Sequence, residues 1–267
     1  MIIRHDLETV LLHVPKCAGK VLRSVFLKGA AADDVISFWE YGWCPRLRRY
    51  VDYAHLPLSD LRVFEEFAYL DRYRVLACIR DPYRRLPSAV NEYYRQKSKR
   101  HEHRVMAGEV SEPMKRRYYR QLATRHAQSD PRFIHSLPIH HFTHFGDEPK
   151  VDDLLRCTSL RSDLLQIGSR LGWPQALLDA AADDLRDDDP SSSEPLSAEE
   201  LALANRLYAV DFATFDFPQQ ADDPALQTQR EQRKAGRIDV LRDAPEVLWH
   251  WGPSARRNDH RLPPVRR

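Results

Sequence analysis

The sequence predicts an α/β fold, in which helices flank a central parallel sheet to give three layers. Two short apolar runs, residues 9–14 (TVLLHV) and 73–79 (YRVLACI), have the composition of buried strands. Each run is followed by a turn and then by apolar residues at helical spacing. Repeated strand–turn–helix units favour parallel strands joined by crossover helices. The chain has 267 residues, 42% of them hydrophobic, which is sufficient for one domain of this kind.

In the first half of the chain, the strand at residues 9–14 leads through a glycine-containing turn into a helix over residues 20–27. Residues 30–58 are rich in aromatic side chains and are expected to be irregular. Ser59 is the expected N-cap of a helix that leads into the strand at residues 73–79. A further helix is expected from about Arg84.

The second half begins with a basic, polar stretch, residues 95–130, which is expected to be helical in part. A strand is expected at residues 151–157 and a helix at residues 162–171. The sequence DDDPSSSE, ending at Glu194, has the composition of a linker. Ser197 and Glu200 then satisfy the capping-box pattern for a helix that runs through Ala209.

The expected domain spans residues 1–217. Residues 218–267 are polar and rich in Pro and Arg, and we expect this tail to lack independent structure.

Composition excludes several classes of protein. The 41 Lys and Arg residues nearly balance the 39 Asp and Glu residues, so a polybasic nucleic-acid arm is not the main feature, and no specific nucleic acid is expected as a partner. No apolar run is long enough to span a membrane, and the N-terminus lacks a signal-peptide pattern. The four cysteines form no C-x-x-C pair, which argues against a disulfide framework or a zinc site. These observations predict a soluble, cytoplasmic protein without a membrane span.

The turn after the first strand, HVPKCAGK, has the chemistry of an anion site. A turn between the carboxyl end of a strand and the amino end of a helix presents backbone N–H groups and the positive end of the helix dipole. Gly19 lets the backbone approach an oxyanion, and Lys16 and Lys20 add positive charge. The turn departs from a Walker A motif because Val14 replaces its first glycine and Val21 replaces the Ser or Thr that binds magnesium. The sequence predicts a nucleotide-anion site that works without a metal, and the alternative is a turn of no function.

A second candidate anion loop follows the second strand. Arg80 stands at the end of this strand, and Ser88 falls on the second turn of the next helix, so the two side chains form a candidate clamp for another phosphate. Asp81 is the expected helix cap, and Pro82 suits the first helical position. Adjacent parallel strands place such loops at the same sheet edge, which suits a nucleotide with phosphates at two places. The alternative is a solvated arginine and a serine on the helix surface.

Three segments resemble the sulfotransferase family. The sequence VPKCAGK resembles the 5′-phosphosulfate loop, commonly written I-P-K-T-x-G-T, and RDPYRRLPS resembles the 3′-phosphate motif. The pattern L-Y-x-x-D-F-x-x-F-x-F at residues 207–217 is similar to the end of the carbohydrate sulfotransferase domain, of the Golgi and heparan types. The resemblance covers residues 8–217 and implies a P-loop-like fold. The sequence departs from the family at Cys17, where Thr or Ser is usual, and at Lys20, which replaces a hydroxyl residue.

The resemblance implies an enzyme that uses 3′-phosphoadenosine 5′-phosphosulfate (PAPS) as sulfuryl donor. It requires no metal, and its acceptor is a hydroxyl of a saccharide or a similar molecule. The residues implied in donor binding are Lys16, Cys17, Ala18, Gly19, Lys20, Val21, Arg80 and Ser88.

Sulfuryl transfer also requires a base for the acceptor hydroxyl and stabilisation of the charge on the transferring group and on the leaving oxygen. Lys16 is the candidate for stabilising these charges. His55 is the candidate base, because the segment YAHLPLS resembles the catalytic H-G-H-V-S segment of heparan-type relatives, with Tyr53 at the first histidine and His55 at the second. Glu40 is the alternative base, since other family members use Glu.

Two further features admit more than one interpretation. A histidine cluster, formed by His135, His140, His141 and His144, lacks the H-E-x-x-H pattern, so we interpret it as a loop that lines the site, with a metal site as the alternative. The basic stretch at residues 95–125, interleaved with tyrosines, is interpreted as a platform for an anionic saccharide or a nucleic acid, or as a solvated helix face. Two rival functions remain: a P-loop kinase that uses ATP or GTP, and a non-catalytic protein that binds a nucleotide or an anionic glycan.

Overall fold

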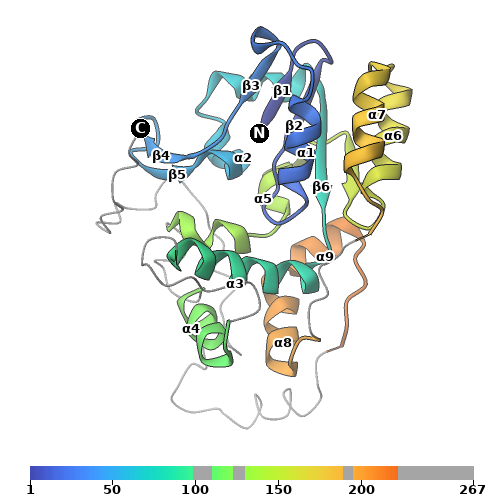
Figure 1. Ribbon diagram of the computed structural model, residues 1–267. Coiled ribbons are helices and arrows are strands. Elements are labelled where there is room, and N and C mark those ends of the chain that lie inside the picture. The colour runs from blue at the N-terminus through green and yellow to red at the C-terminus, as the bar shows by residue number, and fades with distance from the viewer. Residues whose placement is uncertain (99–109, 123–129, 189–194, 222–267) are drawn as a thin grey trace. The chain divides into compact units, whose positions relative to one another are not determined.

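The computed structural model describes residues 1–98, 110–122, 130–188 and 195–221 (Figure 1). The described residues fall into two compact units. The first contains residues 1–80 and 141–188, and the second contains residues 81–98, 110–122, 130–140 and 195–221. The expected linker lies outside the described residues from residue 189, and the expected tail does so from residue 222. In the part of the chain that is described, no helix has the length and apolar character needed to cross a membrane.

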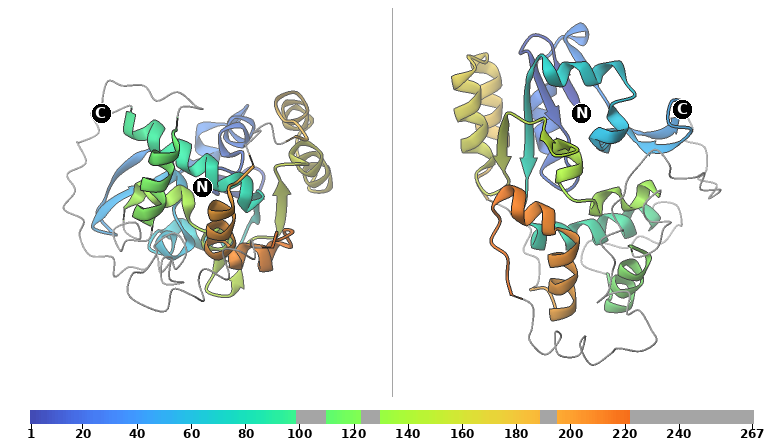
Figure 2. Two further views of the ribbon diagram at one scale, coloured as in Figure 1. Left: turned by 90° about the horizontal axis from the view of Figure 1, so that it is seen from below. Right: turned by 180° about the vertical axis from the view of Figure 1, so that it is seen from behind.

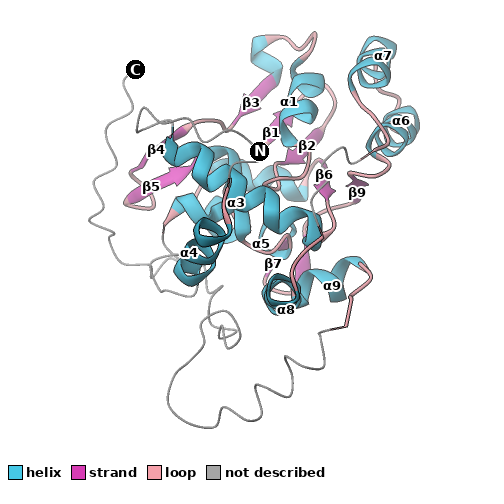
Figure 3. Ribbon diagram, turned by 60° about the horizontal axis from the view of Figure 1, so that its bottom comes forward, coloured by secondary structure: helices cyan, strands magenta, loops and turns pink. Residues whose placement is uncertain are grey.

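The first unit is built on a five-stranded sheet with helices around it. In sheet order its strands are β3 (Val35–Ser37), β1 (Ile2–Arg4), β2 (Thr9–Leu12), β6 (Arg74–Ile79) and β9 (Asp153–Arg156) (Figure 3). The first two strands of this order are antiparallel to their neighbours, whereas β2, β6 and β9 are parallel. The expectation of a wholly parallel sheet is therefore wrong, and the sheet is mixed. The reason is local, because only four residues join β1 to β2, and so short a connection can form only an antiparallel hairpin.

The strand–turn–helix units confirm the α/β class. Strand β2 leads into α1 (Gly19–Leu27), which buries Leu22, Val25 and Phe26 on one face. Strand β9 leads into α6 (Leu160–Arg170), which packs against α7 (Gln175–Asp184) (Figures 1 and 2). Helix α7 also contacts α1, so these helices form one continuous layer.

The segment between α1 and β6 differs from its sequence prediction. Residues 30–58, expected to be irregular, contain β3 and a hairpin formed by β4 (Tyr41–Cys44) and β5 (Arg49–Asp52). The helix expected from Ser59 is only α2 (Leu58–Leu61), and Pro57 precedes it. The backbone is extended at Phe64, which ends the helical run, and the chain continues as a 3₁₀ helix, Glu65–Asp71.

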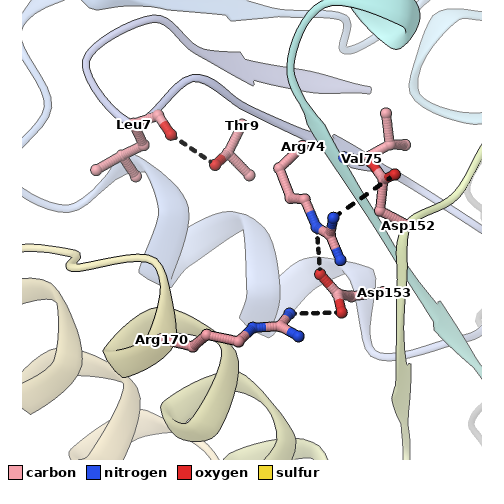
Figure 4. Close-up of polar contacts among 7 residues, drawn as sticks. All are labelled: Leu7, Thr9, Arg74, Val75, Asp152, Asp153 and Arg170. Carbon is pink, nitrogen blue, oxygen red and sulfur yellow. Dashed lines mark hydrogen bonds and ion pairs between the residues drawn. The ribbon is translucent and has the colours of Figure 1, made fainter.

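An ion network holds the amino ends of β6 and β9 together. Arg74 Nε donates to Asp153 at 2.7 Å, and Arg170 donates to the other oxygen of that carboxylate at 2.6 Å (Figure 4). Asp152 accepts the Val75 N–H at 2.7 Å. The network lies at the sheet edge opposite the turns that follow the carboxyl ends of β2 and β6. It therefore supports strand pairing at a distance from the two candidate anion loops, which begin at those turns.

The second unit is helical and has an aromatic core. Its helices are α3 (Pro82–Ser98), α4 (Glu112–Leu122), the 3₁₀ helix Pro131–Ser136, α8 (Ala198–Leu207) and α9 (Ala209–Phe215). The core includes Tyr93, Tyr118, Phe133 and Tyr208. The capping box predicted at the start of α8 is confirmed, because the Ser197 hydroxyl accepts from the Glu200 N–H at 3.3 Å while the Glu200 carboxylate accepts from the Ser197 N–H at 3.0 Å.

Candidate functional site

The two candidate anion loops begin at neighbouring strand ends of the first unit. Strands β2 and β6 are parallel and in register, with Leu12 opposite Ala77, so the turns after them leave the same sheet edge. Arg80 Nη1 donates to the backbone carbonyl of Lys16 at 3.2 Å. The expectation that the two loops lie at the same sheet edge is therefore confirmed for the points where they leave their strands.

The remainder of the second loop belongs to the second unit. Ser88 lies half-buried on α3, and its predicted clamp with Arg80 stays a prediction. The predicted cap is confirmed, because Asp81 Oδ1 accepts from the Tyr83 N–H at 2.8 Å. Pro82 is the first residue of α3, as expected.

The backbone of the first loop is left-handed at two non-glycine residues, Lys16 (φ 65°) and Ala18 (φ 54°). A non-glycine residue with positive φ costs about 1–3 kcal/mol, and such residues cluster at functional sites. Left-handed residues between ordinary ones turn successive N–H groups toward one side, and this geometry forms an anion-binding concavity. The two left-handed residues of this loop are of the kind found in such concavities.

Helix α1 extends this concavity with its amino end. Its first helical hydrogen bond runs from the Leu22 N–H to the Ala18 carbonyl at 3.1 Å. The N–H groups of Gly19, Lys20 and Val21 therefore have no carbonyl acceptor within α1. They lie at the positive end of the helix dipole.

The side chains of the loop divide into exposed charges and a buried thiol. Lys20 is exposed and Lys16 is half-buried, so both can place positive charge near a bound anion. Cys17 is 1% exposed, and its Sγ lies 3.5 Å from the Pro15 carbonyl. The thiol therefore faces the interior, and the Cys17 N–H donates to the Val14 carbonyl at 3.4 Å, so neither group is directed at an anion.

His55 ends the short 3₁₀ helix Tyr53–His55, which Asp52 caps by accepting the Ala54 N–H at 3.1 Å. The His55 Nδ1 atom lies 3.0 Å from the His13 carbonyl oxygen. A carbonyl only accepts hydrogen bonds, so Nδ1 carries the proton and Nε2 carries the lone pair in the neutral ring. Burial lowers the pKa of His55 below its ordinary value, against the opposing charge of Asp52. The ring is thus neutral at neutral pH, as a general base must be.

His13 packs against the His55 ring, and Trp39 stacks on His13; neither was identified as a site residue from the sequence. The two rings stack at 5.6 Å between centroids, and the His13 ring lies 4.2 Å from that of His55. The sequence feature that could have identified His13 is its position between the strand and the candidate anion loop. Glu40, the alternative base, is exposed and has a left-handed backbone (φ 79°).

The histidine cluster is divided between the two units. His135 and His140 belong to the second unit, and His141 and His144 to the first. His144 Nδ1 lies 2.9 Å from the Thr143 hydroxyl, and the His140 N–H donates to the Asp211 carboxylate at 2.9 Å. Both the loop and the metal interpretations stay predictions.

The basic stretch does not present its tyrosines to a ligand. Tyr93, Tyr94, Tyr118 and Tyr119 are buried in the core of the second unit. The aromatic part of the proposed platform is therefore wrong, since these rings stabilise the packing of α3 against α4. Residues 99–109 and 123–125 of this stretch lie outside the described residues.

Comparisons of the chain with protein-family models, with curated proteins and with solved structures found no match. The sulfotransferase resemblance therefore depends on the motifs themselves and on the chemistry of the residues around them.

Proposed function

We propose that this protein is a PAPS-dependent O-sulfotransferase that moves a sulfuryl group to a hydroxyl of a saccharide or a similar acceptor. The observation that carries the proposal is one juxtaposition within the first unit. A loop with two left-handed residues before α1 accepts a hydrogen bond from Arg80, which follows the adjacent parallel strand. The His13 carbonyl at the start of this loop accepts from His55 Nδ1, which leaves the lone pair of the neutral ring on Nε2.

The donor side uses the two loops separately. The first loop receives the 5′-phosphosulfate on the N–H groups of α1, with Lys16 and Lys20 supplying charge. Arg80 supplies a forked pair of donors to the 3′-phosphate.

The acceptor side uses His55. Its Nε2 takes the proton of the acceptor hydroxyl while the oxygen attacks the sulfur atom. The bond between sulfur and the bridging phosphate oxygen breaks, and the electron pair stays on the 5′-phosphate of the product. Lys16 stabilises the charge that develops on that phosphate. No step requires a metal, in accordance with Val21 at the position where a magnesium-binding hydroxyl is usual.

Calorimetry with 3′-phosphoadenosine 5′-phosphate (PAP), the desulfated product, tests the donor site. In buffer containing EDTA we expect the wild type to bind PAP, and we expect Arg80→Ala to weaken binding by about 1.5–3 kcal/mol, the loss of a charge-assisted contact. Arg72→Ala is the matched control, since Arg72 is exposed and precedes the opposite end of β6. We expect adenosine 5′-phosphosulfate, which lacks the 3′-phosphate, to lose less affinity than PAP in Arg80→Ala, since it loses only the support that Arg80 gives the Lys16 carbonyl.

Two outcomes would contradict the proposal. Binding of ATP only with Mg²⁺, and not of PAP, would favour the kinase. Tight binding of PAP without sulfuryl transfer to any acceptor would favour the non-catalytic protein.

A further inference from the structure

His13 contacts both the anion loop and the candidate base. It follows β2 directly, and the Val14 N–H donates to the Leu12 carbonyl at 3.2 Å, so the chain turns tightly at this residue. The turn leaves the His13 carbonyl as the acceptor for His55 Nδ1 at 3.0 Å. One residue thus begins the loop and fixes the base.

The imidazole of His13 occupies the space that Gly19 leaves open. A Cβ atom on Gly19 would lie 1.6 Å from His13 Nε2 and 1.9 Å from Cδ2, distances that require the ring to move. Gly19 is not among the residues with positive φ, so its backbone conformation does not demand glycine. The glycine is required here because the His13 ring approaches the first turn of α1 closely.

Two other rings confine His13. The Trp39 ring lies nearly parallel to the His13 ring, with an interplanar angle of 7°. The Arg23 guanidinium lies over the Trp39 ring, 4.3 Å from its centroid. On the other side, the His55 ring lies 4.2 Å away and tilted by 57°. The His13 ring is therefore packed against α1, Trp39 and His55 at once.

We infer that His13 is a positioning residue that keeps His55 in its Nδ1–H tautomer. Its imidazole fills the space between the Gly19 turn and the His55 ring, and we call it the wedge. The catalytic consequence rests on the proposed function, because it matters only if His55 Nε2 accepts the proton of a substrate. Without the wedge, the His13 carbonyl remains, but the His55 ring loses the surface that aligns its N–H with that carbonyl.

The tautomer of His55 can be measured directly from the ¹⁵N chemical shifts of its ring at a pH where the ring is neutral. We expect the Nδ1–H form to predominate in the wild type and in His13→Phe, which keeps a planar ring. We expect a shift toward the Nε2–H form in His13→Ala, and also in Gly19→Ala, where the new methyl group displaces the wedge. His5→Ala is the matched control, since His5 lies at the other end of the strands and interacts with the Tyr73 hydroxyl at 3.0 Å.

Unchanged tautomers in both His13→Ala and Gly19→Ala would overturn the inference. Thermal unfolding of each variant identifies any loss of fold, and His13→Leu, which fills much of the same volume without a planar ring, replaces His13→Ala if that variant does not fold.

The same variants separate this inference from the proposed function. If the protein is a sulfotransferase, His13→Ala should lower kcat by about 10–100-fold, the effect of a misplaced catalytic group, and this loss should exceed any change in the Kd for PAP that follows from the contact of His13 with Gly19. A wild type that binds no PAP would contradict the proposed function. The tautomer measurement would then still decide the role of His13, because it uses no ligand.

Discussion

At the scale of single residues, the proposed chemistry depends on the protonation of His55. Its Nδ1 donates to the His13 carbonyl, so the lone pair is on Nε2, and burial lowers the pKa of the ring below the ordinary value of 6.5. A lowered pKa keeps the base unprotonated through the neutral range.

The pH dependence of activity follows from this shift. We expect kcat/KM to be constant near neutral pH and to fall only as the pH drops below 6.5, through the lowered pKa of His55. The neutral ring is favoured in the folded state, so the contribution of His55 to stability is complete above its unfolded pKa and is lost as the pH falls through the folded pKa. A pH–rate profile checks this, with equilibrium unfolding measured over the same range. An activity that falls from pH 8 to 7 would assign the ionisation to another group.

At the scale of elements, the proposed anion site depends on the backbone conformation of the loop before α1. Ala18 has φ 54°, a conformation that glycine adopts without cost and that a β-branched residue strongly disfavours. We expect Ala18→Val to lower the free energy of unfolding by about 1–3 kcal/mol and to weaken PAP binding. Ala18→Gly should retain PAP affinity. Calorimetry and urea unfolding of the two variants measure both effects, and equal PAP affinities would show that the left-handed backbone is not needed for the anion.

The pairing of β6 with β9 depends on Asp153. Burial raises the pKa of this carboxyl, but the hydrogen bonds from Arg74 and Arg170 outweigh burial and lower its pKa below 3.8. We expect Asp153→Asn to cost about 1 kcal/mol at neutral pH, a modest value because both arginines are partly exposed. The difference should vanish as the pH falls through the lowered pKa, because the wild-type carboxyl then loses its charge.

Urea unfolding at several pH values tests this, with the exposed Asp33→Asn as control. A difference between Asp153→Asn and the wild type that is independent of pH would mean that the contribution of Asp153 is not electrostatic.

At the scale of the whole molecule, the sequence predicts the strands, helices and helix caps that depend on the local pattern of residues. Composition and spacing predict the strands β2, β6 and β9, the helix after each, and the Ser197 capping box. The same local rules place Lys16 and Arg80 at strand ends, and parallel pairing then brings their loops to one edge.

Other features depend on tertiary contacts that no local pattern contains. Strand β3 pairs with β1 although α1 lies between them in the chain, and the β4–β5 hairpin lies in a segment that was expected to be irregular. Tyr118 sits in a basic stretch yet is fully buried, because composition does not tell which face of a helix meets the core. The role of His13 needs three-dimensional knowledge, since its ring partners are Trp39 and His55.

The most direct test of the sulfotransferase proposal is acceptor-dependent formation of PAP from PAPS in the presence of EDTA, with a panel of saccharides as acceptors, by the wild type and by His55→Asn. The asparagine amide can still donate to the His13 carbonyl but cannot act as a base. We expect the wild type to form PAP only when an acceptor is present. His55→Asn should be slower by about 10²–10⁴-fold, with an unchanged Kd for PAP. Equal rates in the two proteins, or no acceptor-dependent PAP from the wild type, would contradict the proposed catalytic role of His55.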